Sequence, residues 1–139
     1  MIYVIPGHTE TVSAAAGINL DVAGISVIGL GAGSNRPTVT FTTAAAADLD
    51  IGAANVTVKN LLLLNDIDSQ TAMVDVAADD FTMEDCELRE GTAKQALIYI
   101  NIGAANNDSD RCKIRNCRFY SATLGADSAI KLAQVQDGV

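Results

Sequence analysis

A six-residue pattern that recurs four times constrains the fold of this chain more than any other feature. In every copy, apolar residues occupy the first, third and sixth positions, and Gly, Asn or Asp occupies the fifth. The copies span residues 25–30, 56–61, 81–86 and 112–117, so that they begin 31, 25 and 31 residues apart. Repeats of this length are typical of solenoids, in which each repeat forms one turn that stacks on the next.

Strict alternation of apolar residues predicts strands rather than helices. A second short strand is expected before each copy, and one more opens a further turn. These strands cover residues 18–22, 49–51, 74–76, 99–102 and 130–132. The fifth motif position holds residue types that tolerate a positive φ, which predicts a left-handed corner there. The corner residues are Gly29, Asn60, Asp85 and Asn116.

We therefore predict an all-β fold, a right-handed parallel β-helix (solenoid) of about four to five coils, as a single domain over residues 1–139. Inward side chains should align between coils in rows that form the core. The rows are Ile25, Val56, Phe81 and Cys112; Val27, Val58, Met83 and Ile114; Leu30, Leu61, Cys86 and Cys117; and Leu63, Leu88 and Phe119. A β-sandwich with regular turns is the alternative, but it does not require one motif to recur with the same corner residue.

The cysteines have two interpretations. Cys86 and Cys117 fall in adjacent coils, where they are expected to be buried as small apolar side chains. A disulfide between them is the alternative, but parallel neighbours hold their Cβ vectors side by side, which is poor disulfide geometry. With one His and no CxxC motif, the sequence also disfavours a zinc site.

The net charge of −8 disfavours nucleic acid and anionic membrane surfaces as partners. The first residues have neither a basic segment nor a long apolar stretch, so we expect no signal peptide. No capping helix is evident at either end. The chain is therefore expected to be part of a longer protein, or to have its ends covered by a partner or by copies of itself.

Paired carboxylates could in principle serve glycoside hydrolysis. The candidates are Asp79-Asp80 with Glu84-Asp85, and Asp48 with Asp50. Adjacent residues of a strand face opposite sides, so Asp79 and Asp80 could share a substrate only if they lay in a loop. Lys59, Glu84 and Arg115 share one motif position, which favours a cross-strand salt-bridge ladder over a catalytic row.

Three other segments have functional alternatives that we consider less favoured. The segment Asn106–Asp110 resembles a calcium loop but lacks its Gly and Glu positions, which favours a solvated turn. His8 could form an acid–base pair with Glu10, but it follows Pro6-Gly7 and is interpreted as part of a turn. Gly29–Gly33 opens no predicted helix, which disfavours a dinucleotide site. We assign no catalytic, metal or cofactor residue and expect no enzyme.

Several segments resemble those of pectate-lyase-like right-handed β-helix proteins, and more narrowly the β-helix proteins of tailed phages and prophages. They are residues 2–12, 18–20, 24–31, 36–38, 54–61 and 84–86, within about residues 2–119. The resemblance implies a virion or virion-associated protein, made in the host cytoplasm.

The resemblance leads to a structural expectation. The chain should act as a head decoration or a tail or spike module by docking to other virion proteins and to itself, with a trimer favoured among homo-oligomers. A carbohydrate-binding module, or a polysaccharide lyase or hydrolase, is the alternative, although only Tyr3, Tyr99 and Tyr120 offer tyrosine rings for sugar stacking.

Overall fold

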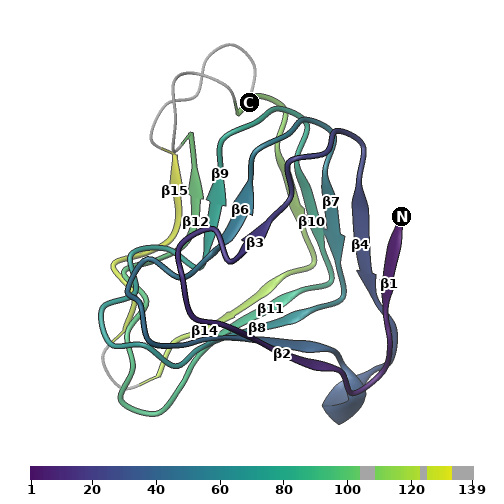
Figure 1. Ribbon diagram of the computed structural model, residues 1–139. Helices are drawn as coiled ribbons and strands as arrows, with labels where there is room; N and C mark the ends of the chain where they lie inside the picture. The colour runs from purple at the N-terminus through teal and green to yellow at the C-terminus, as the bar shows by residue number, and fades with distance from the viewer. Residues whose placement is uncertain (104–108, 123–124, 133–139) are drawn as a thin grey trace.

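The computed structural model describes residues 1–103, 109–122 and 125–132, which form an all-β solenoid of roughly five turns. Its strands form three parallel sheets of five strands each (Figure 1). Sheet 1 contains β1 (Ile2–Val4), β4 (Ser26–Gly29), β7 (Thr57–Lys59), β10 (Thr82–Glu84) and β13 (Lys113–Arg115). Sheet 2 contains β2 (Thr9–Val12), β5 (Thr38–Phe41), β8 (Leu62–Asn65), β11 (Glu87–Glu90) and β14 (Arg118–Tyr120). Sheet 3 contains β3 (Ile18–Asn19), β6 (Leu49–Ile51), β9 (Val74–Val76), β12 (Ile98–Ile102) and β15 (Ser128–Leu132).

Each turn contributes one strand to each sheet, so the sheets are three walls around an apolar interior (Figure 1). Figure 1 looks along the solenoid axis with the N-terminal turn nearest the viewer. The chain runs down sheet 1, across sheet 2 and up sheet 3, and it turns clockwise as it recedes. This is a right-handed winding, and the predicted parallel β-helix is confirmed.

The register confirms most of the predicted rows. Met83 pairs with Val58 on one side and Ile114 on the other, and Leu88 pairs likewise with Leu63 and Phe119. The rows consist of fully buried residues in the middle turns and half-buried residues toward the two ends of the solenoid. Removal of this apolar surface from water is the main favourable term that holds the turns together.

Leu30 and Gly29 depart from the prediction. The corner residues Asn60, Asp85 and Asn116 have φ of 55°, 56° and 54°, as expected, but the backbone of Gly29 is not left-handed. In that turn the chain instead continues into a short 3-10 turn, η1 (Gly33–Asn35), before it enters β5. Leu30 therefore starts an insertion rather than a strand, and it is 41% exposed instead of buried.

A second set of corners was missed by the sequence analysis. The residue just before each motif copy is left-handed, with φ between 56° and 74°. These residues are Gly24, Asn55, Asp80 and Arg111. Three of them are types that tolerate this conformation, but Arg111 is not, so the pattern was visible in only three of the four turns.

Replacing Gly29 with Ala is expected to destabilise the stacking of the second and third turns. A Cβ atom at Gly29 would lie 2.2 Å from the carbonyl oxygen of Asn60 in the next turn, and backbone there cannot move without breaking the ladder. We expect a loss of about 1–3 kcal/mol in the free energy of unfolding, as for other overpacked sites. Urea unfolding followed by circular dichroism measures this loss.

Gly52→Ala is the matched control, because its new Cβ would make its nearest contact at 3.5 Å, with Asn19. This control should stay within about 0.5 kcal/mol of the wild type. Equal unfolding midpoints for the two variants would contradict the close approach of the second and third turns at Gly29.

Candidate docking surfaces

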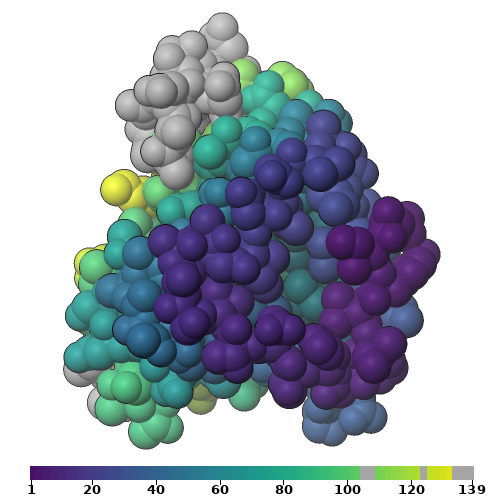
Figure 2. All heavy atoms as spheres, in the orientation of Figure 1, coloured from purple at the N-terminus to yellow at the C-terminus, as the bar shows by residue number. Residues whose placement is uncertain are grey.

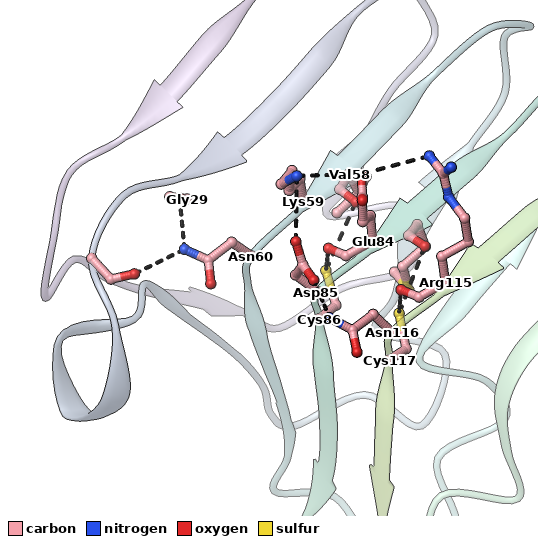
Figure 3. A network of polar contacts seen from close by, with 12 residues as sticks. Gly29, Val58, Lys59, Asn60, Glu84, Asp85, Cys86, Arg115, Asn116 and Cys117 are labelled. Carbon is pink, nitrogen blue, oxygen red and sulfur yellow. Dashed lines mark hydrogen bonds and ion pairs between the residues drawn. The ribbon is translucent and has the colours of Figure 1, made fainter.

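The outer face of sheet 1 carries the predicted salt-bridge ladder. Glu84 lies between Lys59 and Arg115, with N···O distances of 3.3 and 3.6 Å (Figure 3). At the adjoining corner, Lys59 also pairs with Asp85 at 3.3 Å, and the Asn116 amide donates a hydrogen bond to Asp85. That hydrogen bond and Lys59 lower the pKa of the Asp85 carboxyl. These charges on sheet 1 therefore engage one another.

The two stacked cysteines lie just inside this corner. Cys86 is 1% exposed and Cys117 is half-buried, and both are free thiols. The Cys86 thiol donates a hydrogen bond to the carbonyl of Val58, and the Cys117 thiol donates one to that of Met83. The interaction between the two thiols lowers the pKa of Cys117 to about 7 and, together with burial, raises that of Cys86. The interpretation as buried side chains is thus confirmed for Cys86, and the alternative disulfide is not formed.

The paired carboxylates are spread over different environments. Asp79 and Asp80 lie at a corner rather than in a strand, and both contact the Arg111 guanidinium, at 3.3 and 2.7 Å. Glu84 and Asp85 belong to the sheet 1 network. The structure therefore does not bring these two pairs together around one open site.

His8 and Glu10 lie at the N-terminal edge of the solenoid. His8 Nε2 is 3.4 Å from Glu10 Oε2, and the backbone N–H of His8 donates to the carbonyl of Ile5, which closes the expected turn. Glu10 pairs in register with Val39, so it occupies an inward position of the first turn. Both side chains line a cavity of about 120 Å³, which is otherwise largely apolar. In Figure 2 the teal atoms of later turns are visible between the purple strands of this first turn.

The calcium-like segment falls mainly outside the described residues. Of its members, Ser109 and Asp110 are described: the Ser109 hydroxyl donates to the carbonyl of Val76, and the Asp110 N–H donates to Asp79. Within residues 1–103, 109–122 and 125–132, no group of three or more His, Cys, Asp or Glu side chains could hold a metal ion. Gly29–Gly33 leads into η1 and not into an α-helix.

The outer face of sheet 2 carries apolar side chains that the core does not explain. Leu62 and Leu64 alternate with the buried Leu63, so they point outward, and neither belongs to the core cluster. Both are only half-buried. The repeat pattern did not predict them, although a continuous run from Leu61 to Leu64 is typical of a strand that is covered on both faces.

Three arginines and one tyrosine lie beside these leucines. Glu87 pairs with Arg36 at 3.5 Å and also with Arg89, whose guanidinium lies 5.5 Å from the centre of the Tyr120 ring. Arg118 pairs with Glu87 in register on the next strand, and Tyr120 is 60% exposed. Two shallow hollows of about 430 and 550 Å³ follow this face, and Arg89 lines both. The surface is therefore basic although the chain as a whole is acidic.

The outer face of sheet 3 has the opposite character. One polar row follows the register of the strands: Asn19, Asp50, Asp75, Asn101 and Lys131. Asp48 lies two residues before Asp50, and its carboxylate accepts a hydrogen bond from the Ala16 N–H at 2.6 Å. Burial raises the pKa of the Asp50 carboxyl, and the charge of Asp75 raises it further. In the part of the chain that the structure describes, no ion pair reaches these three aspartates.

The fold and these surfaces define a parallel β-solenoid with two outer faces of opposite charge. No family model matches the chain, and neither the curated proteins nor the solved structures contain a match to it. Among the described residues, no helix has both the length and the apolar character needed to cross a membrane.

Proposed function

We propose that this chain is a rigid structural module of a tailed-phage virion, as a head decoration or a tail or spike module, that docks to other virion proteins and to copies of itself. The observation that carries the proposal is the outer face of sheet 2, where Leu62 and Leu64 lie beside three arginines and the exposed Tyr120. Arginine and aromatic residues are enriched in protein interfaces, and Arg and Tyr are frequent among the few residues that supply most of the binding energy.

The regular backbone suits this role. Three parallel sheets with fixed register hold the outward side chains on flat walls, so little conformational freedom is lost when a partner binds. Asp79 and Asp80, which were considered for catalysis, are both held by Arg111. The assignment to a phage particle rests on the sequence resemblance, and it implies synthesis in the host cytoplasm.

A carbohydrate-binding module is the second candidate. The hollow of about 550 Å³ is lined by Tyr120, Arg89 and Ser121, which together offer an aromatic face and hydrogen-bonding groups. An acidic polysaccharide would complement the arginines of the same face. Both candidate functions therefore involve binding at the outer face of sheet 2. The bound partner is a protein in the first and a polysaccharide in the second.

The mass of the native assembly separates the two candidates. Light scattering and native mass spectrometry of the wild type, over a range of concentrations, should show an oligomer. A subunit of 14.4 kDa that stays monomeric at all concentrations would contradict self-assembly. Binding of that monomer to an acidic polysaccharide in a glycan assay would then support the carbohydrate module.

A further inference from the structure

The three sheets differ in whether the charges on their outer faces are paired with opposite charges of the same sheet. Sheet 1 pairs the charges of its ladder within the wall, as Lys59 and Arg115 do with Glu84. On sheet 2, three arginines face one glutamate, Glu87, which leaves an excess of two positive charges. In the described part of sheet 3, Asp48, Asp50 and Asp75 are accompanied by one cation, Lys131, so these four residues have an excess of two negative charges. Opposite, uncompensated charges on two walls of one molecule identify surfaces that can recognise each other.

We propose that the outer face of sheet 2 in one copy binds the outer face of sheet 3 in a second copy. This inference rests on the proposed self-assembly and names the surfaces that perform it. Each copy carries both faces and can bind a neighbour on each side. Identical subunits joined through two different surfaces form a ring when the rotation between them closes, and an open fibre when it does not.

The arrangement of the walls favours a ring. Sheets 2 and 3 are adjoining walls that meet at an edge, as Figure 1 shows, and they do not lie on opposite sides of the solenoid. Successive contacts between adjoining walls change direction at every subunit, so they circle an axis. The solenoids would then stand side by side with their axes roughly parallel.

The heights of the charges along the solenoid agree with this arrangement. Arg36 leads into β5, which belongs to the same turn as β6, the strand of Asp50. Arg89 on β11 lies one turn beyond Asp75 on β9. One turn is about 4.8 Å along the axis, a distance that an extended arginine side chain spans. Subunits at equal height could therefore bring both arginines to the aspartates.

The faces also complement each other chemically. The aspartates of sheet 3 repel one another, and burial raises the pKa of Asp48 as well as that of Asp50. An arginine from a neighbouring copy would relieve this repulsion. On sheet 2, Leu62, Leu64 and the ring of Tyr120 would be removed from water by the same contact, which adds the apolar contribution that charge pairs alone seldom supply.

Charge reversal tests the pairing of the two faces. The basic-face variant is Arg89→Glu with Arg118→Glu, and the acidic-face variant is Asp50→Lys with Asp75→Lys. Each variant alone should weaken assembly by about 100-fold or more, since like charges then face each other. A chain with all four substitutions should recover assembly to within about tenfold of the wild type, because its faces are again complementary. Sedimentation velocity over a concentration series measures each dissociation constant.

Two single variants serve as controls for charge reversal outside the two faces, each with half the change in net charge of a double variant. Lys113→Glu reverses a charge on sheet 1, and Asp68→Lys reverses one in the exposed loop after β8. Both should assemble as the wild type does. Circular dichroism and urea unfolding check the fold of each chain. If a charge-reversed chain fails to fold, the neutral pairs Arg89→Gln with Arg118→Gln and Asp50→Asn with Asp75→Asn replace it and should still weaken assembly measurably.

The outcomes separate this inference from the function on which it rests. A wild type that never assembles would overturn both. A wild type that assembles while either face variant assembles equally well would overturn only the pairing of sheets 2 and 3. Loss of assembly in both variants without recovery in the fourfold variant would also overturn the pairing, because each face would then bind something other than its proposed partner.

Discussion

Replacing Glu90 with Leu is expected to lower the free energy of unfolding by about 3 kcal/mol or more. Glu90 ends β11 at an inward position and is only 3% exposed. Its carboxylate accepts hydrogen bonds from the N–H groups of Ala96 and Ala122, at 2.9 and 2.8 Å, and from the Ser121 hydroxyl at 2.9 Å. Leucine fills a similar volume but leaves three donors without their acceptor, and each unsatisfied buried donor costs about 1–3 kcal/mol.

The loss should be measured by urea unfolding with Glu84→Leu as the matched control. Glu84 lies on an outward position of β10, where its ion pairs with Lys59 and Arg115 are partly exposed. Such pairs contribute at most about 1 kcal/mol, so this control should change stability little. If the two variants unfold at the same urea concentration, Glu90 does not stabilise the corner between sheets 2 and 3.

The turns of this fold could be predicted from the sequence because inward and outward residues alternate in strands, and the pattern repeats once per turn. Stacking requires the same rows in every turn, so Val58, Met83 and Ile114 indicate both strand and register. Corners at Asn60 and Asp85 were visible because few residue types tolerate a positive φ at low cost.

Other features depend on contacts that alternation does not reveal. Leu30 occupies the sixth motif position, but an insertion starts there, and a local pattern cannot show that the chain reaches β5 through the 3-10 turn η1. Glu90 lies two residues after the inward Leu88, so strand alternation places its side chain inward as well. A carboxylate at that position is nevertheless easily interpreted as the polar residue at which a strand ends. Its acceptance of hydrogen bonds from residues 96, 121 and 122 depends on chain segments brought close only by the fold.

The residues of the two docking faces likewise could not be grouped from alternation alone. Arg36, Arg89 and Arg118 are far apart in the sequence, and their gathering follows from the lengths of the turns. The three aspartates of sheet 3 are also brought together by the fold, because Asp75 lies beside Asp50 only through the register of β9 with β6. The candidates Asp48 and Asp50 were found from the sequence as a pair that could share a face, while their basic counterpart was not.

Replacing Leu62 and Leu64 together with Ser is expected to weaken assembly by about 10- to 100-fold, beyond a loss of about 1.5–3 kcal/mol in subunit stability from the half of each side chain that the fold already buries. Each leucine is already half-buried, so a partner would remove only the remainder of its surface from water. About half of the 1.5–3 kcal/mol that a fully buried leucine contributes, taken twice, corresponds to roughly a tenfold to a hundredfold change or somewhat more. Sedimentation velocity gives the dissociation constant, and urea unfolding at low concentration gives the stability of the subunit.

Ile28→Ser is the control, because Ile28 is an outward, half-buried apolar residue on sheet 1, where no docking is proposed. It should leave assembly unchanged. Wild-type assembly of the double variant would show that the outer face of sheet 2 is not an interface. Serine at these two positions leaves the inward Leu63 and the backbone ladder in place, so a loss of assembly that Ile28→Ser does not show would mean that the outward leucines of β8 contact a partner.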